Sequence, residues 1–114
     1  MTATATFAFD HNSLYRNLGG GAFEDASQGA GLTASTFERM SWGLAFLDAD
    51  LDADLDLYFA NGHLFPQVDE HPELKESYAQ RDQVFANEGG RFRDVSATAG
   101  RGLTAQKPSR AVAV

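Results

Sequence analysis

Residues 47–57 read LDADLDADLDL, with an aspartate at every second position from Asp48 to Asp56. A solvated strand face would place these carboxylates side by side, where like charges repel, and aspartate is depleted in strands. A disordered acidic tract would lack the apolar residues that fill every gap between the aspartates. A bound cation removes the repulsion, so the run predicts a metal site more readily than either alternative.

The ligand type and the spacing of the run favour calcium. Oxygen ligands suit a hard ion, and magnesium keeps its waters more tightly than calcium does. A calcium loop takes side-chain ligands at positions 1, 3 and 5, a backbone carbonyl at position 7 and a carboxylate at position 9. Position 12 is Phe59, where an EF-hand needs a glutamate, so we expect a loop between two strands instead. The expected ligands are Asp48, Asp50, Asp52, the carbonyl of Asp54, and Asp56.

The rest of the composition bounds the class of protein. The 114 residues make one small domain or a piece of a larger protein. No apolar run approaches the ~18 residues that a membrane span needs, and residues 1–10 do not read as a secretory signal. The absence of cysteine excludes disulfides and thiol catalysis. The net charge of −7 argues against a nucleic-acid binder, and five of its negative charges lie in the aspartate run.

The chain also repeats itself with an offset of close to seventy residues. Residues 12–32 and 82–103 each contain an asparagine, a glycine cluster and a Phe-x-Asp-x-Ser motif, and residues 41–46 are echoed by 109–114. This period is long for one propeller blade of ~40–50 residues, but it fits a blade with an inserted loop. We therefore expect about one and a half repeats, with a first unit over residues 12–81 and a second, truncated unit over 82–114.

The local pattern is all-β. Residues 13–17 and 22–26 flank one glycine-rich turn, and residues 84–87 and 91–95 flank another, which predicts two hairpins. Apolar patterns predict strands on both sides of the aspartate run, over residues 42–47 and 55–59. The only helix we expect is a short polar insertion over residues 69–80. The expected fold is a set of antiparallel β-hairpins that form part of a β-propeller.

Residues 41–63, SWGLAFLDADLDADLDLYFANGH, resemble an FG-GAP repeat, the blade unit of integrin α-chain-type β-propellers. From residue 12 to residue 114 the chain is similar to bacterial VCBS-repeat proteins of the ASPIC/UnbV, or cartilage-acidic-protein, type. The similarity is carried by residues 12–17, 23–25, 48–56, 60–63, 80–85 and 92–96. It implies a partial FG-GAP propeller that is secreted or displayed on a cell surface.

One position departs from the family loop. Position 6 is glycine in the family, because the backbone turns there into a left-handed conformation, and it is Ala53 in this chain. That conformation costs an alanine about 1 kcal/mol. We expect a weakened calcium site, not a lost one.

The expected function is a structural, adhesion or ligand-binding scaffold without catalysis. Its expected partners are other propeller blades, copies of itself, or an extracellular protein or glycan. We expect no nucleic-acid partner and no membrane span. The alternatives are a calcium-stabilised propeller domain of a secreted enzyme and a truncated reading frame without independent function. Ser41 lacks the glycine pattern of a hydrolase nucleophile. His63 is expected to be a structural turn histidine.

Overall fold

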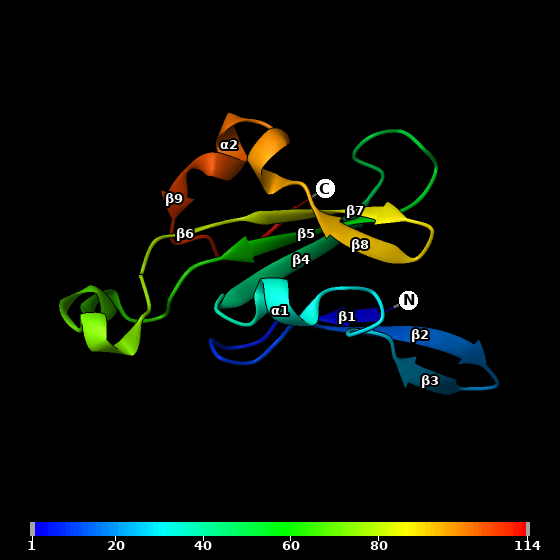
Figure 1. The fold of residues 1–114 in the computed structure, drawn as a ribbon, viewed down its shortest axis with the longest axis horizontal. Helices are drawn as coiled ribbons and strands as arrows, with labels where there is room; N and C mark the ends of the chain where they lie inside the picture. Colours follow the sequence, from blue (N-terminus) through cyan, green and yellow to red (C-terminus); the bar gives the residue numbers. More distant parts are fainter. Residues whose placement is uncertain (1, 114) are drawn as a thin grey trace.

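The computed structural model describes residues 2–113, most of whose regular structure is antiparallel β-strand (Figure 1). One sheet consists of β1 (Thr2–Thr4), β2 (Ser13–Gly19) and β3 (Ala22–Asp25). The largest sheet has the order β4 (Ser41–Leu47), β5 (Asp56–Asn61), β7 (Gln83–Glu88) and β8 (Arg91–Asp94). A third pairs β6 (Gln80–Arg81) with β9 (Gln106–Lys107). The all-β prediction is confirmed, and these open sheets, none of them a closed barrel within residues 2–113, are consistent with part of a propeller.

Both predicted hairpins form, and the same hydrogen bonds hold them. In each, the serine of the Phe-x-Asp-x-Ser motif accepts a hydrogen bond from a backbone N–H on the first strand. The pairs are Leu14 with Ser27 and Val84 with Ser96, both at 2.9 Å. The aspartate of the motif accepts the N–H of its own serine, at 2.9 Å in the first copy and 3.0 Å in the second. We call this arrangement the Asp-x-Ser pin. The repeat boundaries themselves stay a prediction.

The core lies between the four-stranded sheet and the β1–β2–β3 sheet beside it (Figure 1). Phe59 of β5 and Phe85 of β7 are fully buried, and their rings meet edge to face with centroids 5.8 Å apart. Leu14 of β2 belongs to the same cluster, which joins the two sheets. Burial of each such side chain contributes about 1.5–3 kcal/mol. Phe23 and Trp42 lie outside this core and are exposed.

The helix expected over residues 69–80 is wrong in type and extent. Two 3₁₀ helices, η1 (Pro66–Glu70) and η2 (Pro72–Leu74), occupy this region, and residues 75–79 are not helical. Pro72 lacks the N–H that a continuous helix would need, and Lys75 ends η2 in a left-handed conformation with φ 55°.

Three further short helices were not expected from the sequence: α1 (Thr33–Thr36), η3 (Ser96–Thr98) and α2 (Arg101–Thr104). None of the helices between residues 2 and 113 has the length and apolar character required to cross a bilayer.

The echo of β4 near the end of the sequence does not form a strand over residues 109–113, and Val114 lies outside the described residues. β4 is a strand because it pairs with β5, whereas no described residue after Lys107 belongs to a strand that could pair with this segment. The segment instead passes over two glycines. A Cβ on Gly43 would lie 2.8 Å from the Val112 nitrogen, so this close approach requires glycine.

Candidate metal centre

The aspartate run forms the loop that joins β4 to β5. The last pair of this ladder is Leu47 with Asp56, so residues 48–55 project from the end of the four-stranded sheet. In Figure 1 this loop and the segment over residues 62–79 lie at opposite ends of β5. The β4–β5 ladder therefore fixes both ends of the loop on a rigid base.

Three of the expected ligands come together at the base of this loop. Asp48, Asp50 and Asp56 each contribute one carboxylate oxygen to a group in which all the atoms lie within 4.8 Å of one another. Calcium–oxygen bonds of about 2.3–2.6 Å place two ligands of one ion no more than roughly 5 Å apart. The separations of the three oxygens are therefore within the range that ligands of a single calcium ion span. Asp52 and Asp54 are not members of this group, and their part in a site stays a prediction.

The loop folds around the first aspartate. The two carboxylate oxygens of Asp48 accept hydrogen bonds from the backbone N–H groups of Asp52 at 3.0 Å and Ala53 at 2.9 Å. Asp52 in turn accepts the N–H of Asp54 at 2.9 Å. A carboxylate oxygen has two lone pairs, so one N–H leaves it able to bind a cation as well. These bonds hold Asp48 and the loop backbone in a compact turn.

The backbone of the loop is left-handed at two residues that are not glycine. Ala53 has φ 72°, as expected from its position 6 in the loop. Leu51 has φ 61°, which the sequence did not predict, and its side chain is 87% exposed. This conformation places the Cβ of an L-residue too close to the following carbonyl oxygen. The loop is thus strained twice within three residues.

Asp56 connects the loop to the neighbouring strand. Its side chain is buried, and its two oxygens accept the backbone N–H groups of Ala49 at 2.9 Å and Asn87 at 2.8 Å. The Asn87 side chain also donates to the Leu55 carbonyl at 3.1 Å. Sequence reasoning assigned no part to Asn87 in the site, although its recurrence as Asn17 in the first copy was a signal. The aspartate cluster is therefore held from β7 as well as from its own loop.

The electrostatics of the cluster favour a cation. Partial desolvation raises the pKa of the Asp50 carboxyl, and the hydrogen bond and negative charge of Asp52, with the charge of Asp56, raise it further. A raised pKa means that the ionised carboxylate is disfavoured in these surroundings. A divalent cation between the carboxylates reverses this preference, because it supplies the positive charge that the loop lacks.

His63, at the opposite end of β5, is buried in the turn that follows the strand. Its Nδ1 accepts the backbone N–H of Phe65 at 3.1 Å, and its Nε2 lies 3.8 Å from a carboxylate oxygen of Glu76. The contact with Phe65 is of the kind expected for a turn histidine. Glu76 was missed, because it lies in a polar stretch that resembled an exposed helix.

Comparisons with protein-family models, with curated proteins and with solved structures gave no match to this chain. The resemblance to FG-GAP and VCBS repeats is therefore still a prediction from the residues quoted above.

Proposed function

We propose that this chain is a calcium-binding β-sheet scaffold whose loop over residues 48–56 holds one ion. The observation that carries the proposal is the group of three carboxylate oxygens from Asp48, Asp50 and Asp56 within 4.8 Å of one another. In the proposed site, Asp52 and the backbone carbonyl of Asp54 complete the ligand set. The donors are all oxygen, which fits calcium better than zinc or copper.

The ion would stabilise the sheet. It neutralises carboxylates that otherwise repel one another, and it acts on β7 through Asp56, whose other contacts include the Asn87 N–H. Extracellular modules bind calcium with dissociation constants of about 10⁻⁴–10⁻³ M. At ~1 mM calcium and a dissociation constant of ~10⁻⁴ M, mass action stabilises the fold by about 1.4 kcal/mol. This corresponds to a rise in Tm of roughly 5–10 °C.

The test is thermal unfolding in chelator and in calcium, followed by circular dichroism. Asp50→Ala should abolish the calcium-dependent rise in Tm. Asp54→Ala is the matched control, because it removes the same charge from the same loop but keeps the proposed carbonyl ligand. Magnesium should raise Tm much less, since it resists losing its waters. Superimposed curves in chelator and calcium, or equal loss in the two variants, would contradict the proposal.

The proposed role of the scaffold is adhesion or ligand binding outside the cell, alongside other propeller blades or copies of this chain. Several large apolar side chains are exposed, among them Leu18 and Phe23 of the first hairpin and Trp42 of β4. Exposed apolar surface of this kind supports association with a further β-sheet. Sedimentation equilibrium would measure self-association directly. Turnover of polysaccharides or esters by the purified chain would favour the enzyme alternative instead.

A further inference from the structure

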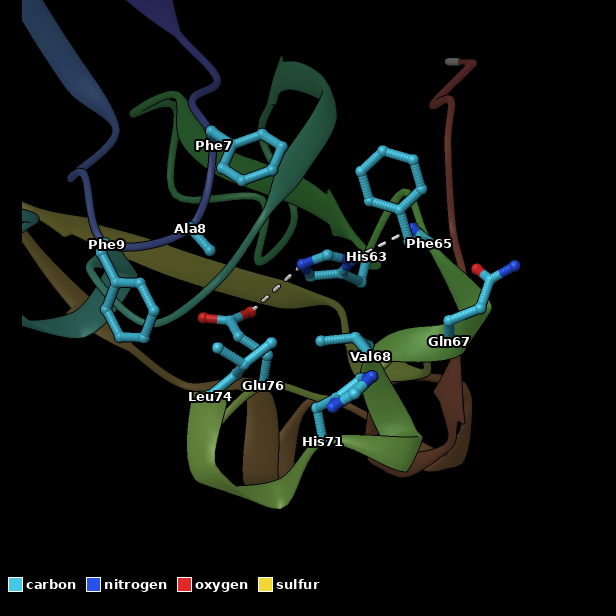
Figure 2. A pocket seen from close by; sticks show the side chains of 10 residues that line it. All are labelled: Phe7, Ala8, Phe9, His63, Phe65, Gln67, Val68, His71, Leu74 and Glu76. Atoms are coloured by element: carbon cyan, nitrogen blue, oxygen red, sulfur yellow. Dashed lines mark hydrogen bonds and ion pairs between the residues drawn. The ribbon is translucent and has the colours of Figure 1, made fainter.

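An apolar pocket of about 320 Å³ (Figure 2) is lined by part of the segment over residues 62–79, which lies at the end of β5 away from the aspartate loop (Figure 1). The loop over residues 7–9 forms one side, and the segment over residues 63–76 forms the other. Its walls include the rings of Phe7, Phe9 and Phe65 and the side chain of Leu74, all of them about half exposed. The pocket is large enough for a small aromatic molecule, and it is independent of the proposed calcium site.

A buried carboxyl group without a partner lies in the wall of this pocket. The Glu76 side chain is 4% exposed, and neither of its oxygens has a hydrogen-bond partner among residues 2–113. Nε2 of His63 lies 3.8 Å from one of its oxygens, which is too long for a hydrogen bond. Buried polar groups are almost always hydrogen-bonded, so this exception points to a missing donor.

The groups around Glu76 do not supply that donor. His63 accepts the Phe65 N–H through Nδ1, so the neutral imidazole carries its proton on Nε2 and holds it out of reach of the carboxyl. His71 also lines the pocket, but its Nδ1 lies 3.1 Å from Glu73. Burial raises the pKa of Glu76, and the nearby charge of Glu38 raises it further, while the charge of Arg39 lowers it.

We propose that this pocket binds a small organic ammonium ion, with the ammonium group on Glu76 and an aromatic or aliphatic body among the phenylalanine rings. A protonated amine brings both the N–H donors and the positive charge that the Glu76 carboxylate lacks. Aromatic ring faces attract cations, and apolar walls favour the body of such a ligand. An anion is disfavoured by the same carboxylate.

Glu76 lines the pocket, but both of its carboxyl oxygens are buried. Phe9 and Leu74 border Glu76 in Figure 2, and both side chains are half exposed. The proposed binding mode requires these two side chains to rotate so that the ligand reaches the carboxyl. The Nε2–H of His63 remains free to donate to a hydroxyl or carbonyl oxygen on the same molecule.

The test uses three probes of similar size: phenethylammonium, 2-phenylethanol and phenylacetate. Titrations are followed by calorimetry and by the amide NMR signals of residues 7–9 and 63–65. Phenethylammonium should bind wild-type protein with a dissociation constant on the order of 1 mM. The neutral probe should bind at least tenfold more weakly, because it lacks the positive charge that pairs with the carboxylate, and the anionic probe should bind more weakly still, because the carboxylate repels it.

Two variants locate the ammonium. Glu76→Gln keeps the size of the side chain and should weaken phenethylammonium at least tenfold while leaving 2-phenylethanol unchanged. Glu73→Gln, an exposed glutamate on the same segment, is the matched control and should change neither. Binding of the amine should also weaken as Glu76 becomes protonated, beginning above the ordinary glutamate pKa of 4.5.

Several results would overturn the proposal. These are equal affinities of the amine and the alcohol for the wild type, no binding of the amine at all, an unchanged affinity in Glu76→Gln, or NMR shifts confined to residues outside the pocket. The comparison of probes needs no variant, so it holds even if a substitution alters folding.

Discussion

Replacement of Ala53 by glycine should stabilise the protein, although glycine usually destabilises. Ala53 has φ 72°, and a left-handed conformation costs a non-glycine residue roughly 1–2 kcal/mol. Against this gain, glycine lowers the free energy of unfolding by about 0.4–1 kcal/mol, because it raises the entropy of the unfolded chain. The net gain is therefore about 0.5–1 kcal/mol in the free energy of unfolding.

The assay is urea unfolding of wild type and variant in chelator and in millimolar calcium. Ala49→Gly is the matched control, because Ala49 is exposed in the same loop and its φ is not positive. That change should lose about 0.5–1 kcal/mol, so the two variants should differ by about 1–2 kcal/mol. Equal destabilisation by both substitutions would refute the argument that Ala53 is strained.

Three further substitutions test contacts described above. Asp56→Asn should lower the free energy of unfolding by about 1–3 kcal/mol even in chelator. The Asp56 carboxylate accepts the N–H groups of Ala49 and Asn87, and an asparagine has only one oxygen to accept them, so one N–H loses its acceptor. An effect seen only with calcium would contradict this. Ser96→Ala should cost a similar 1–3 kcal/mol in urea unfolding, because the buried Val84 N–H loses its acceptor. Burial raises the pKa of Glu76, so its protonated form stabilises the fold below the unfolded value of 4.5, and this contribution is lost as pH rises through the raised pKa. Glu76→Gln should therefore raise Tm at pH 7 and flatten the pH dependence; an unchanged profile would show that the carboxyl is solvated.

The strands of the two hairpins and of the β4–β5 pair could be predicted from the sequence because their signals are local, whereas β1, β6 and β9 were not predicted. Each hairpin has a glycine turn between two short β-type runs, and β4 is a continuous apolar segment. The prediction of a helix over residues 69–80 is wrong because it rested on the polar composition of the segment. Pro72 separates two 3₁₀ helices there instead of continuing one helix. Residues 109–113 resemble β4 in sequence but do not form a strand, because a strand needs a partner to pair with and the motif itself does not supply one.

In the two candidate sites, contacts within one loop could likewise be predicted from the sequence, and contacts between distant segments could not. The alternation of aspartates was enough to bring Asp48, Asp50 and Asp56 together, since all three belong to one loop and its base. Asn87 lies 31 residues from Asp56, and that contact exists only because β5 pairs with β7. Glu76 and His63 meet through the irregular segment over residues 63–76, whose path no periodicity describes.

The two Asp-x-Ser pins also bear on how fast the chain folds. They join residues that are only 13 and 12 positions apart in the sequence, and hairpins of this kind form within about 1–10 μs. β4 and β5, by contrast, must close a loop whose carboxylates repel one another. We expect the two hairpins to form first and the β4–β5 ladder to limit the rate. Calcium should then accelerate folding in stopped-flow experiments, in addition to slowing unfolding.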